Sequence, residues 1–135
     1  MAGRRRYFIA ASLFGFAGVG LGAFGAHALK SLLTPDMFSV FETGVRYQMY
    51  HTFALFVASW GYQKSGAPAF WASALLFSLG IVLFSGSLYL LAMTSVVWLG
   101  FVTPFGGLSF LGGWGMLGYA FWKETTGEKS QDHPS

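Results

Sequence analysis

The polar residues that could do chemistry gather at one boundary of the second apolar segment. They are a carboxylate, a guanidinium, a phenol, an amide and two imidazoles: His27, Glu42, Arg46, Tyr47, Gln48 and His51. At about 100° per residue, a helix places Gly44, Tyr47, Gln48 and His51 on one face. Because imidazole titrates near neutral pH, this face is a candidate site for proton-linked or ligand-binding chemistry.

Three interpretations of the two histidines remain open. The first is a hydrogen-bonded lock between two helices, with Tyr47 and Gln48 as partners and Glu42 and Arg46 as an ion pair at i and i+4. The second is a proton-linked or ligand-binding site that uses His27 and His51. The third is metal or haem ligation, but two ligands are an incomplete zinc site and the sequence has no haem motif. We therefore predict neither a metal nor a cofactor.

Enzymatic chemistry finds little support in the sequence. The apolar segments contain no pair of carboxylates, and the chain has neither a GxSxG motif nor a phosphate-binding loop. It has no cysteine, which excludes disulfides, thiolate zinc sites and thiol redox catalysis within this chain. We therefore predict that the protein is not an enzyme.

The elements that position these residues are apolar and long. The chain has 135 residues, of which 54% are hydrophobic and only 10% are charged, whereas soluble domains carry about 25% charged residues. Between Lys64 and Lys123 there is no acidic, basic or histidine residue. The net charge of +3 does not indicate nucleic-acid binding, because Arg4, Arg5 and Arg6 stand together before an apolar run, as in a membrane anchor. The composition predicts an integral membrane protein.

Four apolar segments are long enough, or nearly so, to span a bilayer as helices. Thr34 and Thr103 each precede a proline, a pair that predicts a helix N-cap followed by the first helical residue. We expect an all-α, integral membrane four-helix bundle as a single domain over residues 1–123, with a polar and disordered tail over 124–135. The predicted spans are 7–26, 46–63, 70–93 and 104–122.

The basic residues predict that both ends of the chain lie in the cytoplasm. This topology gives six basic residues inside and two outside, in agreement with the positive-inside rule. The inner ones are Arg4, Arg5, Arg6, Lys64, Lys123 and Lys129, and the outer ones are Lys30 and Arg46. Ala26-His27-Ala28 imitates a signal-peptidase site, but the uncharged run over 7–26 has 20 residues, which exceeds the roughly 7–15 residues usual for the apolar region of a signal peptide. We therefore expect the first segment to stay in the protein.

Glycines lie inside the apolar segments at spacings typical of helix packing. Gly15, Gly18 and Gly22 share one face of the first segment, and the last two form a GxxxG pair. In the fourth segment, Gly106 and Gly113 share one face and Gly107 and Gly118 another. We predict that these glycines pack helices within the bundle, with homodimerisation through GxxxG as the alternative.

Four motifs in order resemble one family of small bacterial inner-membrane proteins, the YgdD-like and YwdK-like family. They are GAFGAHAL at 22–29, YQMYH at 47–51, LFSGSLY at 83–89 and TPFGG at 103–107, and the resemblance covers nearly all of residues 6–122. The resemblance implies a four-helix membrane protein with small eukaryotic relatives. It implies no biochemical activity.

Together these features predict a multi-pass protein of the plasma (inner) membrane. We interpret it as a non-enzymatic accessory protein for envelope integrity or for a membrane complex. The alternative is a small transporter or proton-coupled channel that uses the histidine and glutamine face at the outer membrane boundary. Its expected partners are the lipid bilayer and either a membrane protein complex or further copies of the chain.

Overall fold

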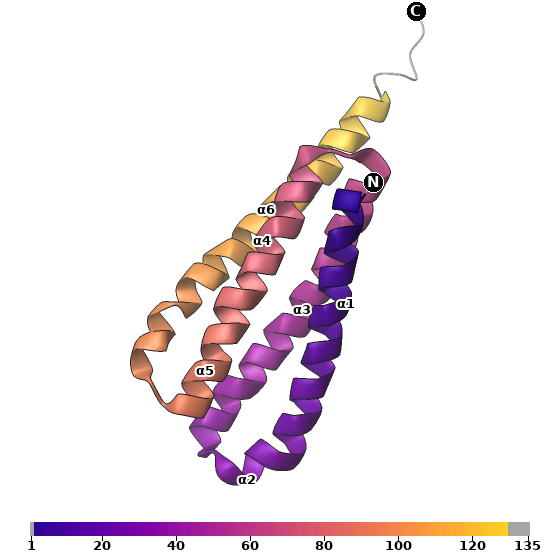
Figure 1. The fold of residues 1–135 in the computed structure, drawn as a ribbon. Helices are drawn as coiled ribbons and strands as arrows, with labels where there is room; N and C mark the ends of the chain where they lie inside the picture. Colours follow the sequence, from indigo (N-terminus) through magenta and orange to yellow (C-terminus); the bar gives the residue numbers. More distant parts are fainter. Residues whose placement is uncertain (1, 130–135) are drawn as a thin grey trace, which may run out of the picture.

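The chain folds into long helices joined by short connections in a computed structural model that describes residues 2–129. Figure 1 shows the path of the chain. Two π-helical turns, η1 and η2, and one 3₁₀ turn, η3, interrupt or join the α-helices. The elements are α1 (Ala2–Phe24), η1 (Gly25–Leu29), α2 (Lys30–Leu32), α3 (Pro35–Ser65), α4 (Pro68–Gly80), η2 (Ile81–Ser85), α5 (Gly86–Thr94), η3 (Val97–Phe101) and α6 (Thr103–Lys129).

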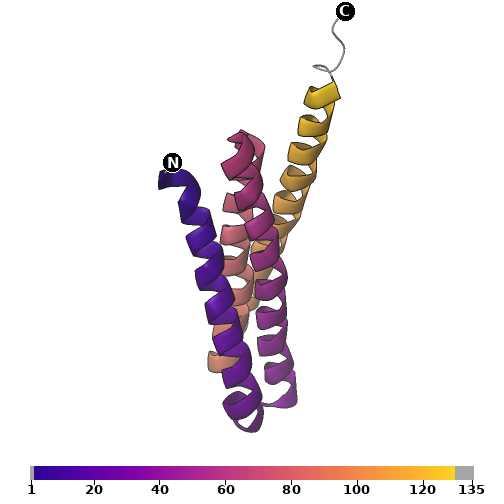
Figure 2. The ribbon, with the colours of Figure 1, turned by 90° about the vertical axis from the view of Figure 1, so that its right-hand side faces the viewer.

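The long helices pack as an open row. α1 packs along α3, α3 along α4 and α5, and α4 along α6. Both ends of the described chain and the α3–α4 turn lie at one end of the molecule, and α2 and the α5–α6 connection lie at the other (Figure 1). Figure 2 shows the helices diverging toward the end that carries the termini. The predicted all-helical fold is confirmed, and α1 and α6 are the outer members of the row.

The signal at the start of α3 acts as the sequence predicts. The Thr34 hydroxyl accepts a hydrogen bond from the Met37 backbone N–H at 3.3 Å, and Pro35 is the first helical residue. This cap satisfies one of the N–H groups that a helix start leaves unpaired. At the other end Gly66 adopts a left-handed φ of 71°, a conformation that glycine reaches without steric cost.

The start of α6 differs from the prediction. Thr103 is already helical, and its hydroxyl hydrogen-bonds the Ser87 hydroxyl of α5 at 2.7 Å. It is therefore not an N-cap; the preceding turn η3 leads the backbone into the helix instead, with Phe105 N–H donating to the Val102 carbonyl. The Thr103 hydroxyl therefore links α6 to α5, an interaction that the local sequence alone does not reveal.

The end of α6 also differs. We expected a disordered tail from Glu124, but α6 continues to Lys129, so this part of the prediction is wrong for 124–129. The Thr125 and Thr126 hydroxyls donate to the carbonyls of Phe121 and Trp122, four residues earlier, as helical threonines commonly do. Residues 130–135 lie outside the described residues.

Most of the predicted packing glycines face a neighbouring helix. A Cβ atom added at Gly15, Gly18 or Gly22 would meet side chains of α3, at 2.5 Å from the Met49 sulfur in the case of Gly18. Those at Gly106 and Gly113 would meet Phe84 and Phe77. The second face of α6 is different, because Gly107 reaches only ordinary contact at 4.0 Å from Phe84 and Gly118 faces open space. The α1–α3 seam and one of the two α6 faces are thus built on glycine.

Large apolar side chains remain exposed on all the long helices. Phe16 of α1 is 82% exposed, Phe53 of α3 is 64% exposed and Trp122 of α6 is 65% exposed. Two helical segments, Arg5–Leu32 and Pro68–Thr94, are long and apolar enough to cross a membrane. In the most apolar 18-residue stretch of each, only 17% and 39%, respectively, is buried within the chain. Helices this apolar and this exposed are suited to lipid rather than water.

Candidate functional site

Gln48 joins three helices at the centre of the predicted polar face. It is buried on α3, where its Nε2 donates to the Phe14 carbonyl of α1 and its Oε1 accepts from the Tyr89 hydroxyl of α5, both at 2.7 Å. Gly18 permits this approach, since a Cβ there would lie 3.3 Å from Nε2. Both polar atoms of the Gln48 side chain thereby form a hydrogen bond with a neighbouring helix.

His51 lies one turn further along α3 and connects it to α6. Its Nδ1 lies 2.7 Å from the Tyr47 carbonyl, and Trp114 donates its Nε1–H to Nε2 at 3.2 Å. Because Nε2 accepts and a carbonyl can only accept, Nδ1 carries the proton, which assigns the neutral tautomer. The ring stacks on Phe110 of α6 with centroids 3.5 Å apart. Both nitrogens are used, and proton uptake at Nε2 would break the bond from Trp114.

Hydroxyl groups make further links between the helices. The hydroxyls of Ser73, Ser85 and Ser109 each donate to a backbone carbonyl of another helix, at 2.7–2.8 Å. Among the described residues, no buried side-chain nitrogen or oxygen lacks a hydrogen-bond partner. Polar groups that are paired in this way tie helices together in an apolar medium, where an unpaired group would cost several kcal/mol.

The structure brings together only part of the predicted cluster. Tyr47, Gln48 and His51 adjoin, although Tyr47 contributes its carbonyl rather than its hydroxyl to His51. The tyrosine ring packs on Phe84 at a centroid distance of 4.7 Å. The sequence did not link Tyr89 and Trp114 to this face, because they lie about 40 and 60 residues further along the chain, and no short-range spacing can reveal such pairs.

His27 lies apart from the other imidazole. It is exposed in η1, close to Gly25, and Gly25 packs against Phe41. His51 is ten residues further along α3 than Phe41, which places the two histidines roughly 15 Å apart along the helix axis. The interpretations in which both imidazoles share one proton-linked or metal site are therefore wrong. In the part of the chain that is described, no three His, Asp or Glu side chains cluster as metal ligands.

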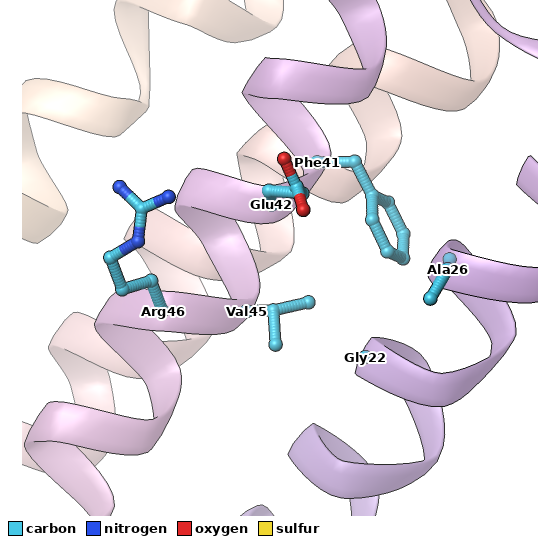
Figure 3. Close-up of a pocket in the computed structure, with 7 residues that line it drawn as sticks. Gly22, Ala26, Phe41, Glu42, Val45 and Arg46 are labelled. Carbon is cyan, nitrogen blue, oxygen red and sulfur yellow. The ribbon is translucent and has the colours of Figure 1, made fainter. Parts of the chain in front are cut away.

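Glu42 and Arg46 line a separate pocket between α3 and the end of α1. The cavity has a volume of about 220 Å³, and small residues of α1 and η1, Gly22, Gly25 and Ala26, form its opposite wall. Figure 3 shows the Arg46 side chain running back toward the level of Glu42, with the guanidinium and the carboxylate apart. The predicted ion pair between these two described residues does not form. The pocket therefore keeps one free charge of each sign.

Comparisons with known proteins agree with the apolar surface of the helices. The family model described as "Protein of unknown function (DUF423)" matches residues 21–107. The chain is 42% identical to the UPF0382 membrane protein YwdK of Bacillus subtilis (strain 168), over 82% of this chain and 91% of that protein. It is 42% identical to the UPF0382 inner membrane protein YgdD of Escherichia coli (strain K12), over 84% of this chain and 86% of that protein.

A UPF0382 membrane protein of Staphylococcus haemolyticus (strain JCSC1435) is 46% identical, over 82% of this chain and 90% of that protein. No solved structure matches. These matches span most of both chains and confirm the family that the four motifs indicate. The relatives are named as membrane proteins, which agrees with the exposed apolar helices of this chain. The chain therefore belongs to the DUF423 family and is a membrane protein similar to the UPF0382 proteins YgdD and YwdK.

Proposed function

We propose that this protein is a non-enzymatic accessory component that binds another membrane protein within the plane of the bilayer. The observation that carries this proposal is the use of the interior polar groups. Gln48, His51 and Tyr89 bond neighbouring helices in the described core. The core is thus built as a structural lock, which favours the first interpretation of this face over a transport path through His51.

The outer helices offer the surface for such a partner. α1 and α6 stand at the two ends of the row, and both carry large exposed apolar side chains, such as Phe16 and Leu111. The connections between the described helices are short and offer little surface for binding in water. A protein of this shape is suited to contacts made by its lipid-facing helices, where packing and small residues drive association.

We also propose that the end with both termini faces the cytoplasm. Lys64 and Lys123 lie toward this end, while Lys30 lies at the other, in line with the positive-inside rule. The chain has no cysteine, so single cysteines report position without background. We expect a membrane-impermeant thiol reagent to label Ser31→Cys and Ser95→Cys in intact spheroplasts, and Ser65→Cys and Thr125→Cys only after lysis. The reverse pattern would show the opposite orientation.

The accessory role is tested by extracting the full chain with its surrounding lipid and reading the intact complex by native mass spectrometry. We expect a second polypeptide in defined stoichiometry, retained through size-exclusion chromatography. A control extraction from cells that lack the chain should not yield that polypeptide in the same fraction.

Reconstituted vesicles test the alternative, a small transporter or proton-coupled channel. If the purified protein carries protons or a solute across the bilayer at a rate that His51→Gln abolishes while the helical content is unchanged, the protein is a transporter and the accessory proposal fails. We expect flux equal to that of protein-free vesicles, because His51 is held between Tyr47 and Trp114.

A further inference from the structure

We propose that the pocket between η1 and α3 binds the headgroup of a zwitterionic phospholipid that carries a primary ammonium, of the phosphatidylethanolamine class. Arg46 binds the phosphate, and Glu42 binds the ammonium. This site is independent of the accessory role, because it uses neither the interior network nor the outer faces of α1 and α6.

The charges of the pocket match such a headgroup. Glu42 and Arg46 are both exposed, and they lie one helical turn apart on α3. Residues at this spacing commonly pair with each other on a helix surface, yet here each remains available (Figure 3). A guanidinium binds phosphate oxygens through two parallel hydrogen bonds, and a carboxylate accepts from an ammonium. One group of each sign on neighbouring turns of α3 is complementary in charge to the phosphate and the amine of such a headgroup.

The shape of the pocket limits what it can hold. Its volume of about 220 Å³ corresponds to roughly seven water molecules at about 30 Å³ each, which is the size of a headgroup and not of a whole lipid. Glycines make this space, because Gly22 and Gly25 present bare backbone to α3. A Cβ at Gly25 would lie 2.6 Å from the Phe41 ring, so the aromatic wall of the pocket depends on this glycine.

The same face of α3 continues into a track for an acyl chain. Tyr50, Phe53 and Val57 follow Arg46 at helical spacing, and they are 56%, 64% and 42% exposed. The uncharged part of α3 begins directly after Arg46 and runs to Gln63. Arg46 therefore lies where the headgroup layer meets the hydrocarbon layer. Along this face the charged residues come first and the apolar residues follow, in the same order as the headgroup and the acyl chain of a phospholipid.

Glu42 also determines which lipid is favoured. An anionic headgroup such as phosphatidylglycerol has a phosphate for Arg46 but no cation for Glu42, and the carboxylate repels its net charge. We therefore expect Arg46 to supply most of the affinity and Glu42 to supply most of the discrimination.

The test is native mass spectrometry of the full-length protein, delipidated in detergent and titrated with dioleoyl phosphatidylethanolamine or dioleoyl phosphatidylglycerol. We expect wild type to bind the first lipid about tenfold more tightly. Arg46→Gln should weaken that binding about tenfold, and Glu42→Gln should abolish the preference between the lipids. Lys30→Gln and Asp36→Asn each remove one charge of the same sign at exposed positions near the end of the molecule that carries α2. They should leave the affinity and the lipid preference unchanged.

Several outcomes would overturn the assignment. Equal binding of the two lipids by wild type would exclude selection by headgroup, and an Arg46→Gln variant that behaves like Lys30→Gln would exclude this pocket. Displacement of the lipid by an equal concentration of water-soluble phosphoethanolamine would show that the ligand is a soluble amine phosphate instead. Circular dichroism of each variant checks that the exposed substitutions leave the fold intact.

Discussion

Gly106→Ala is expected to lower the free energy of unfolding by about 2 kcal/mol or more. Gly106 is buried at the point where α6 crosses η2, and an added Cβ would collide with the backbone nitrogen and Cα of Phe84. This backbone cannot easily move, because Ser85 next to it donates to the Gly44 carbonyl of α3 at 2.7 Å. Thermal unfolding in mild detergent, followed by far-ultraviolet circular dichroism, measures the loss as a melting temperature lower by several degrees.

Gly107→Ala is the matched control for this substitution. It makes the same chemical change one residue later, where the nearest atom to an added Cβ lies 4.0 Å away. Alanine favours the helical state over glycine by about 1 kcal/mol, so Gly107→Ala should be neutral or stabilising. If both variants melt at the same temperature, the close approach of α6 to η2 is not a determinant of stability.

The sequence predicts the helices well because their signals are local. Thr34 caps the helix that Pro35 begins through contacts within a few residues, and an apolar run of 20 residues has few alternatives to a helix in a bilayer. The same reasoning misplaced Thr103, because its hydroxyl has a better partner in Ser87 of another helix than in its own backbone. Local signals fail where a distant residue competes for the same hydrogen bond.

The polar face shows the same division between local and distant information. Helical spacing placed Gln48 and His51 together correctly, since both lie on α3. It could not place Tyr89 and Trp114 beside them, and it wrongly suggested that His27 shares their site. The glycine pattern carried more information about distance, because Gly106 and Gly113 mark the face of α6 that approaches Phe84 and Phe77. Glycine spacing thus indicated one face of α6 that a neighbour approaches, but it did not distinguish that face from the one with Gly107 and Gly118, where no neighbour comes close.

Gln48→Leu should lower the stability of the bundle, because it removes the hydrogen bonds that join α3 to α1 and α5 while changing the side-chain volume only slightly. The substitution removes the bonds to the Phe14 carbonyl and to the Tyr89 hydroxyl, and it leaves that hydroxyl half-buried without its partner. A buried polar group left unpaired costs about 1–3 kcal/mol, and bonds between membrane helices average about 0.6 kcal/mol with a maximum near 1.7. We therefore expect a loss of about 1–2 kcal/mol in the free energy of unfolding.

A double-mutant cycle with Tyr89→Phe isolates the bond between the two side chains. Tyr89→Phe alone removes one donor and leaves Gln48 bonded to Phe14, so it should cost less than Gln48→Leu. Once Gln48 is leucine, the second substitution removes an unpaired hydroxyl and should cost nothing or restore stability. Tyr50→Phe is the control, because this tyrosine is 56% exposed on the same helix. Strictly additive losses would mean that the bond orients the helices without stabilising them, and the lock would then rest on the Phe14 carbonyl and on His51.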